Sequence, residues 1–210
     1  MPVIKFNKRL IYFSHIPKCG GTSIESYLSQ ITQSKLSFID SNFHRQSIEG
    51  RWNISSPQHI PGVIVQRLFP IDFFDIFFTV VRNPLKRFYS AFEFNKRKSL
   101  LDPNIDINYF VENFHSFKPF QLGNFDNHFL PQVSFLYPNA NYQVFKLESG
   151  LHLVKAYIDS VILGKESGFS MPHVDFHYDD SIVIEKKLLS STSLQLIYEI
   201  YKNDFESFKY

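Results

Sequence analysis

Residues 13–23, FSHIPKCGGTS, carry the groups that a protein uses to bind an anion. The glycine pair lets the backbone wrap closely around a ligand, and a helix that starts after it would direct free N–H groups at that ligand. Lys18 contributes a full positive charge, and two hydroxyl side chains follow it. The segment therefore predicts a site for phosphate or a similar oxyanion. The expected ligands are Pro17, Lys18, Cys19, Gly20, Gly21, Thr22 and Ser23.

The order of residues in this segment argues against two other anion loops. A nucleoside-triphosphate loop has the form GxxxxGK[ST], with its lysine after the glycines, whereas Lys18 precedes them. A phosphatase loop with a cysteine nucleophile needs an arginine six positions further on, and Glu25 occupies that position. Cys19 is the only cysteine, so the chain has no internal disulfide and fits a reducing compartment. Next to a helix N-terminus, we expect its pKa to be lowered and its thiol to be sensitive to alkylation.

A second candidate anion site lies in residues 80–92, VVRNPLKRFYSAF. Arg82 can hold a phosphate with its guanidinium fork. Asn83 and Pro84 are typical of a helix start, as N-cap and first-turn residue. Arg87, near the start of that helix, fits either a further role in the site or a solvated arginine on the surface.

The histidines do not indicate a metal site. All eight are scattered along the chain, and His173 with His177 is a single i,i+4 pair in what reads as a loop. The sequence predicts no metal ion.

Alternating strands and helices are expected to position both segments. Apolar runs predict strands at residues 10–16, 75–81 and 142–148. Helical patterns follow each of them, which indicates an α/β fold with a parallel sheet. The ligand of such a sheet lies at the carboxyl ends of the strands, where both candidate segments fall. The expected helices cover residues 22–31, 84–98 and 193–208, with others after Pro61 and between 148 and about 161, and short helices and loops at 102–137.

Composition limits the class of protein. A chain of 210 residues with 44% hydrophobic and 20% charged residues fits one soluble domain, 1–210. Its net charge of +2 gives no support for a nucleic-acid partner. The longest apolar run, residues 73–81, is far shorter than the ~20 residues of a membrane span. We expect a cytoplasmic protein with no integral span, and peripheral membrane attachment stays open.

The two segments together resemble the PAPS-dependent sulfotransferases, in particular the carbohydrate branch of the heparan and chondroitin type. HIPKCGGTS is similar to the loop that binds the 5′-phosphosulfate, which is close to HIPKTGGTS in that branch. VVRNPLKRFYSAF resembles the 3′-phosphate motif of the same enzymes. The final segment, IYEIYKNDFESFKY, is similar to their Tyr-x-x-Asp-Phe terminal helix. The resemblance spans nearly the whole chain.

The resemblance implies a P-loop-like, three-layer α/β fold, with a central parallel sheet of four or five strands flanked by helices. It implies in-line transfer of a sulfuryl group from 3′-phosphoadenosine-5′-phosphosulfate (PAPS) to a hydroxyl of a carbohydrate or glycolipid, without a metal. A small-molecule or nucleotide kinase and an inactive nucleotide- or glycan-binding protein remain as alternatives. The oligomeric state stays open.

The resemblance also implies roles for single residues. Lys18 would neutralise the leaving oxygen, the loop would hold the 5′-phosphate, and Arg82 with Ser90 would hold the 3′-phosphate. His59, between the two motifs, is the first candidate for the general base. The other candidates are His128, then His44, with Glu25 and Glu49 as alternative bases. His15 is expected to shape the loop, Cys19 to replace a threonine, and Lys165 and Ser170 to contact the nucleotide near Asp175, where relatives often have asparagine.

Overall fold

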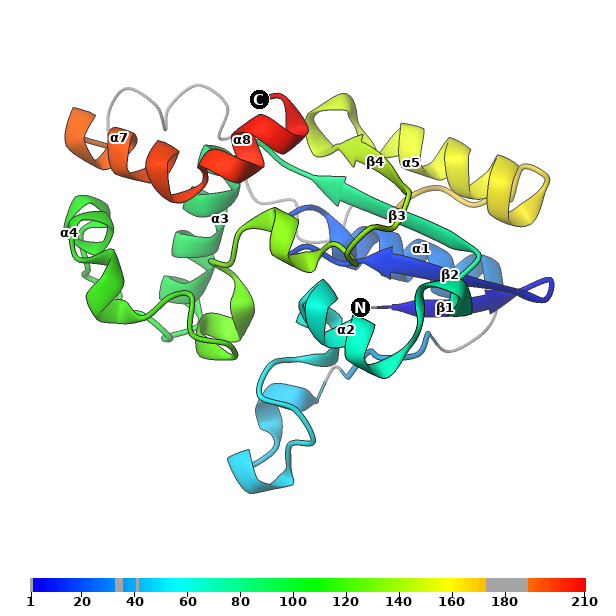
Figure 1. The fold of residues 1–210 in the computed structure, drawn as a ribbon, viewed down its shortest axis with the longest axis horizontal. Helices are drawn as coiled ribbons and strands as arrows, with labels where there is room; N and C mark the ends of the chain where they lie inside the picture. The colour runs from blue at the N-terminus through cyan, green and yellow to red at the C-terminus, as the bar shows by residue number, and fades with distance from the viewer. Residues whose placement is uncertain (1, 33–35, 41, 173–188) are drawn as a thin grey trace.

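The computed structural model describes residues 2–32, 36–40, 42–172 and 189–210. At its centre is a four-stranded sheet in the order β1-β2-β3-β4. β2 pairs in parallel with β3, and β3 in parallel with β4, whereas β1 pairs antiparallel with β2. The strands are β1 (Val3–Phe6), β2 (Arg9–Ser14), β3 (Ile76–Val81) and β4 (Tyr142–Lys146). The chain therefore has a mixed α/β fold with a mostly parallel sheet (Figure 1).

The three predicted strands are confirmed, with ends that differ by a few residues. The expected parallel pairing is present among β2, β3 and β4, and β1 adds an antiparallel edge strand that was not predicted from the sequence. A tight turn joins β1 to β2, and its residues Asn7 and Lys8 have φ of 47° and 67°. A two-residue hairpin needs such left-handed backbone. The hairpin was missed because lysine is not typical of this position.

Helices cover both faces of the sheet. On one face, Phe13 of β2 and Phe78 of β3 belong to a core with residues of α1 (Gly21–Thr32) and α5 (Leu151–Tyr157). On the other face, Tyr12 and Phe77 pack with α2 (Gly62–Leu68). The predicted helices at these places are confirmed, although α5 continues as a π-helix, Ile158–Leu163.

A separate helical cluster lies beyond the carboxyl edge of the parallel strands (Figure 1). Its core contains many of the phenylalanines, including Phe88, Phe110 and Phe129. The helices are α3 (Pro84–Arg97), α4 (Ile107–Glu112) and α7 (Ser191–Ile200), with α8 (Lys202–Phe208) next to them along the chain. The predicted helix at 84–98 is confirmed, and the one at 193–208 breaks at Tyr201 into α7 and α8.

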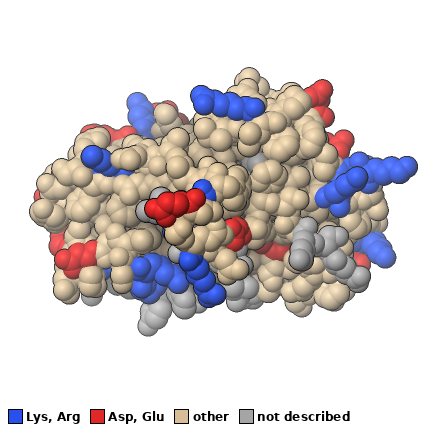
Figure 2. All heavy atoms as spheres, turned by 90° about the horizontal axis from the view of Figure 1, so that it is seen from below, with Lys and Arg blue, Asp and Glu red and all other residues tan. Residues whose placement is uncertain are grey.

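The surface carries charges of both signs. In Figure 2, lysine and arginine lie in separate groups between aspartate and glutamate, so this face has no broad basic surface. Over the residues that the structure describes, no helix has both the length and the apolar character to cross a membrane.

Candidate active site

The first predicted segment forms a loop between β2 and α1. Lys18 and Gly20 both have left-handed backbone, with φ of 67° and 81°. Left-handed residues occur in the turns whose backbone N–H groups form anion-binding concavities. Of the two predicted hydroxyl donors, Thr22 is exposed and Ser23 is buried in the first turn of α1. The loop therefore has the backbone geometry expected of an oxyanion site.

Gly21 is required by the packing of His15 under the loop. A methyl group at this position would overlap the His15 ring. His15 is buried, and its Nδ1 contacts the carboxylate of Glu25 on α1. Burial acts to raise the pKa of Glu25, but the neighbouring His15 outweighs it and the pKa is lowered. His15 thus shapes the loop as predicted, and Glu25 is a charged partner of His15.

Arg82 connects the second segment to the first. Its Nη1 donates to the carbonyl oxygen of Lys18 at 3.4 Å. The buried side chain of Gln132 holds the backbone of Arg82, accepting from its N–H and donating to its carbonyl oxygen, both at 2.9 Å. Asn83 caps α3 as predicted, accepting from Leu85 N and Lys86 N. The structure therefore brings the two predicted anion segments together at the carboxyl edge of the sheet.

Arg87 is buried, which contradicts one of the two alternatives considered from the sequence. Its side chain is 0% exposed, and it donates to the carbonyl oxygens of His128 and Leu130 at 3.0 and 2.6 Å. Arg87 therefore holds the segment that contains His128. The expectation of a solvated surface arginine is wrong, because the side chain is buried and both terminal nitrogens donate to carbonyl groups inside the protein.

The C-terminal Tyr-x-x-Asp-Phe motif holds the same segment from the other side. The hydroxyl of Tyr201 donates to Phe129 O at 2.7 Å. The carboxylate of Asp204 accepts from Gln132 N and Val133 N at 2.8 and 3.0 Å. These contacts fix the position of His128 and Gln132, so the motif acts on the candidate site through the packing of this segment.

His59 forms a buried pair with Asp126. The His59 Nδ1 lies 2.7 Å from Asp126 Oδ2 and 3.1 Å from the hydroxyl of Ser56. Asp126 also accepts from the backbone N–H and the hydroxyl of Ser56, at 2.6 and 2.8 Å. Because a carboxylate can only accept, Nδ1 carries the proton, and Nε2 keeps its lone pair. This is the state that a general base requires.

An unusual backbone places Asp126 under His59. Phe125, Asp126 and Asn127 have φ of 49°, 51° and 63°, three successive left-handed residues that are not glycine. Asn127 stabilises the arrangement by donating to His59 O at 2.9 Å and accepting from Gly123 N at 2.8 Å. Strained backbone of this kind persists where the surrounding contacts enforce it, and it is frequent at functional sites.

His128 lies beside His59. The ring centroids of the two histidines are 5.2 Å apart, and those of His15 and His59 are 4.9 Å apart. Asn95 of α3 uses its amide group to donate to His128 Nδ1 at 3.2 Å. The proton of a neutral His128 is then on Nε2, so His128 offers a donor where His59 offers an acceptor.

Both histidines are held neutral by their surroundings. Burial lowers the pKa of His59, and Asp126 acts in the opposite direction without cancelling the effect. Burial, together with the nearby His59, lowers the pKa of His128 well below its usual range. A neutral imidazole near pH 7 can accept a proton from a hydroxyl group.

His59, Asp126 and His128 also form a group whose ligand atoms lie within 4.8 Å of one another, close enough to hold a metal ion. The sequence did not predict such a group. Asp126, however, uses both oxygens in hydrogen bonds to Ser56 and His59. These bonds fit a proton-transfer pair better than a set of open metal ligands.

The buried position of Cys19 contradicts the prediction that its thiol is reactive. Its side chain is 1% exposed, and the Sγ lies 3.4 Å from Gln132 Oε1. Burial raises the pKa of Cys19 to about 12, although Arg87 and Arg82 act to lower it. Desolvation of the thiolate thus outweighs the attraction of the two arginines.

The folded protein is therefore expected to resist iodoacetamide at pH 8 and to react at Cys19 once unfolded in urea. Mass spectrometry of the alkylated peptide measures both rates. Rapid modification of the folded chain at the rate of the unfolded one would contradict this burial. We expect Cys19→Thr to remain active, since the thiol is not required for the proposed chemistry.

The remaining predicted residues fall into two groups. Glu49 is exposed on a short 3-10 helix, Ile48–Gly50, in a part that projects away from the sheet (Figure 1). Lys165 and Ser170 are exposed in the segment after the π-helix, and Ser90 is half-buried on α3. The side chain of His44 and the residues His173, Asp175 and His177 lie outside the described residues.

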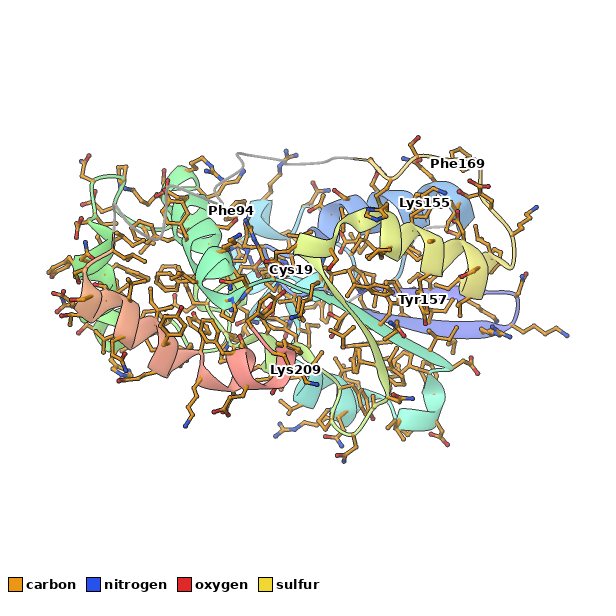
Figure 3. The ribbon with its side chains drawn as sticks, turned by 90° about the horizontal axis from the view of Figure 1, so that it is seen from above. Cys19, Phe94, Lys155, Tyr157, Phe169 and Lys209 are labelled. Carbon is orange, nitrogen blue, oxygen red and sulfur yellow. The ribbon has the colours of Figure 1, made fainter. Side chains whose placement is uncertain are left out.

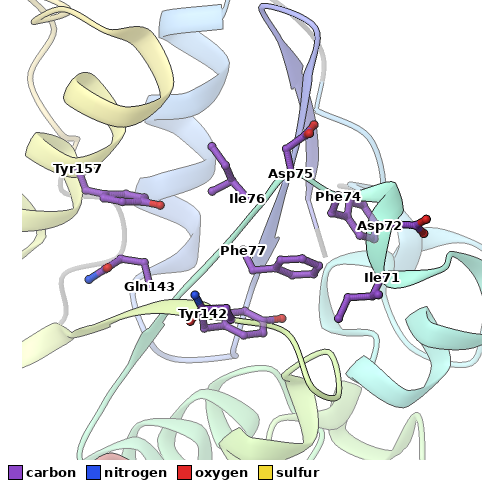
Figure 4. Close-up of a pocket in the computed structure, with 10 residues that line it drawn as sticks. Ile71, Asp72, Phe74, Asp75, Ile76, Phe77, Tyr142, Gln143 and Tyr157 are labelled. Carbon is purple, nitrogen blue, oxygen red and sulfur yellow. The ribbon is translucent and has the colours of Figure 1, made fainter.

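Two pockets in the described part of the chain differ in how close they lie to this site. One pocket, of about 500 Å³, is lined by residues that include Leu151, Lys155, Phe169 and Ser170. Figure 3 labels Lys155 and Phe169 of this pocket, and also Cys19. The pocket borders the loop, because a Cβ atom at Gly20 would lie 3.5 Å from Leu151. The other, of about 450 Å³, lies at the amino ends of β3 and β4 between Phe77, Tyr142 and Tyr157 (Figure 4). Only the first adjoins the predicted anion loop.

The comparison with protein families covers almost the whole chain. A family model described as "Sulfotransferase family" matches residues 3–210. No curated protein and no solved structure gives a significant match.

Proposed function

Because the chain belongs to the sulfotransferase family, we propose that it transfers a sulfuryl group from PAPS to a hydroxyl of a carbohydrate acceptor. Family membership supports sulfuryl transfer in general. The observation that carries the choice of PAPS is the joining of two anion segments by Arg82 and Gln132. PAPS has phosphate groups at both the 3′ and the 5′ position, so it needs two such sites.

The donor would span the carboxyl edge of the sheet, as in P-loop-like folds. We place its 5′-phosphosulfate on the loop from Pro17 to Ser23, where the backbone of Lys18 and Gly20 is suited to an anion. Arg82 and Ser90 would hold the 3′-phosphate. The pocket beside Leu151 is close enough to the loop to receive the nucleoside, with Ser170 on its wall and Lys165 nearby along the chain.

The chemical step is an in-line displacement at sulfur. The acceptor oxygen forms a bond to sulfur while the bond breaks between sulfur and the oxygen that bridges it to the 5′-phosphate. Negative charge develops on the bridging oxygen, which leaves as adenosine 3′,5′-bisphosphate, and the ammonium of Lys18 stabilises it. The hydroxyl proton moves to Nε2 of His59. No residue forms a covalent intermediate, and no metal ion takes part in this scheme.

The hydrogen bonds of the two histidines support different roles for them. His59 presents a free lone pair on Nε2, while Asp126 orients the ring and stabilises the imidazolium that forms. His128 presents an N–H, which would donate to an oxygen of the sulfuryl group or of the acceptor. His59 is therefore the proposed base, and His128 the proposed hydrogen-bond donor.

Asp126→Asn is expected to lower kcat roughly 10–100-fold and to leave nucleotide affinity unchanged. An amide can donate to His59 Nδ1 and favour the wrong tautomer, and it no longer stabilises the imidazolium. Because the Asp126 carboxylate raises the pKa of His59, its loss should also move the acid limb of the kcat profile to lower pH. Kinetics from pH 5 to 8 measure both effects.

Ser56→Ala is the matched control for this variant. It removes one hydroxyl from the same carboxylate and keeps the bond from the Ser56 backbone N–H to Asp126. We expect a much smaller effect on kcat. A wild-type acid limb in Asp126→Asn would contradict the role of the carboxylate.

The function itself is tested with ³⁵S-labelled PAPS and a panel of polysaccharides, oligosaccharides and glycolipids. We expect label to appear in at least one carbohydrate, with EDTA in the reaction mixture. Parallel reactions with γ-³²P-labelled ATP and Mg²⁺ test the kinase alternative. Transfer of phosphate without transfer of sulfate would overturn the proposal.

A further inference from the structure

Phe94 joins two residues of the candidate site that come from different parts of the chain. It lies on α3 (Figure 3). Ser90 is four positions earlier on this helix, and residues at this spacing share a helix face. The Lys18 ammonium lies over the Phe94 ring, 4.1 Å from the centroid. The ring of His128 packs against Phe94 at a centroid distance of 4.8 Å and an interplanar angle of 84°. No motif in the sequence indicates a role for Phe94.

We propose that Phe94 is a positioning residue that holds the Lys18 ammonium beside His128, ready for the leaving oxygen. The catalytic use of this ammonium position rests on the proposed function. Lysine has a long flexible side chain, so its charge is useful for catalysis only where a neighbour restricts it. The face of an aromatic ring attracts a cation through its quadrupole, and Phe94 supplies that face at the carboxyl edge of the sheet.

An aromatic ring suits this task better than a carboxylate. Asp or Glu in the same place would pair with Lys18 and would repel the phosphosulfate of the donor. Phe94 has no net charge, so it can hold the ammonium in the free enzyme while the site keeps its attraction for an anion. Its half-buried ring also packs against His128, whose orientation Asn95 fixes from the same helix.

The contact can be weakened without changing the shape of the residue. Incorporation of phenylalanine with one, two or three fluorine atoms at position 94 withdraws electron density from the ring face. We expect kcat to fall with each added fluorine, while the KM for the acceptor stays constant. Phe94→Leu should lower kcat roughly 2–30-fold, and Phe94→Trp should retain it.

Lys98→Ala is the control for general changes of charge around the ring. Lys98 is exposed at the end of α3, and its ammonium lies 5.7 Å from the same centroid. We expect no change in kcat. A flat kcat across the fluorinated series would overturn the proposal, as would a rising acceptor KM at constant kcat, which would make Phe94 a platform for the acceptor.

A measurement without turnover separates this proposal from the proposed function. In protein with ¹³C-labelled lysine, the ring current of Phe94 should shift the ε-methylene signal of Lys18 upfield, with Lys18→Met assigning the peak. Phe94→Leu should remove the shift and Lys98→Ala should preserve it. If the shift is present but no sulfate is transferred, only the proposed function fails. If the shift is missing in the wild type, the positioning by Phe94 fails.

Discussion

Lys18→Ala should lower kcat roughly 10²–10³-fold, equivalent to ~2.7–4 kcal/mol of barrier, the size seen when one oxyanion donor is removed. Lys18 lies on the left-handed part of the loop, and its ammonium is held over Phe94. The charge that it would neutralise appears on the bridging oxygen only as the sulfur–oxygen bond breaks. The loss should therefore appear mainly in kcat, and single-turnover kinetics with PAPS measure it directly.

The control for Lys18→Ala is Lys5→Ala, which removes an exposed positive charge from β1. We expect Lys5→Ala to retain the wild-type rate. A Lys18→Ala protein with unchanged kcat would show that another group stabilises the leaving oxygen.

His59→Ala should lower kcat roughly 10²–10⁴-fold, the usual contribution of a general base. Affinity for adenosine 3′,5′-bisphosphate should change little, because the proposed role of His59 concerns the acceptor and not the nucleotide. The Nε2 of His59 is the proposed proton acceptor, and its Nδ1 is bonded to Asp126. Steady-state kinetics and a binding titration separate the two effects. Added imidazole should restore part of the rate.

His115→Ala is the matched control, because His115 is an exposed histidine on a 3-10 helix, Phe114–Phe117. It should have wild-type kinetics. If His59→Ala is as active as the wild type, the base is another group of the cluster. His128 and the His15–Glu25 pair would then be tested next.

The anion loop and the start of α3 could be predicted from the sequence, because residues close together in the chain determine them. The loop with Gly20 and Gly21 follows a buried strand and opens a helix, and Asn83 with Pro84 starts α3 as its residue types predict. Parallel pairing of β2 and β3 then brings both segments to one edge. That part of the prediction needed only the conformational preferences of the residues and the parallel pairing of the strands.

The supporting residues depend on contacts between distant parts of the chain, which a single sequence does not reveal. Asp126 meets His59 across 67 positions, and Gln132 meets Arg82 across 50. Aspartate and asparagine adopt left-handed backbone as single residues, and a run of three left-handed residues at 125–127 is not indicated by any local pattern. The sequence FDNH, in which a carboxylate stands two positions before His128, was the one available signal.

Burial explains the errors about Arg87 and Cys19. Both belong to the motif segments. From the sequence, Arg87 was expected to be solvated or to have a role in the site, and Cys19 was expected to be reactive. Arg87 instead holds the carbonyl groups of His128 and Leu130, and Cys19 lies under the loop against Gln132. Each is placed by the segment 128–132, whose position depends on Tyr201 and Asp204 near the C-terminus.

The central claim, that the site holds a nucleotide by two phosphate groups, is tested most directly by calorimetric titration with adenosine 3′,5′-bisphosphate, AMP and ATP. The bisphosphate should bind far more tightly than AMP, since only it reaches both the loop and Arg82. Arg82→Ala should bring the bisphosphate close to the affinity of AMP, while Lys5→Ala leaves the difference intact. Tight binding of ATP with no binding of the bisphosphate would contradict the account.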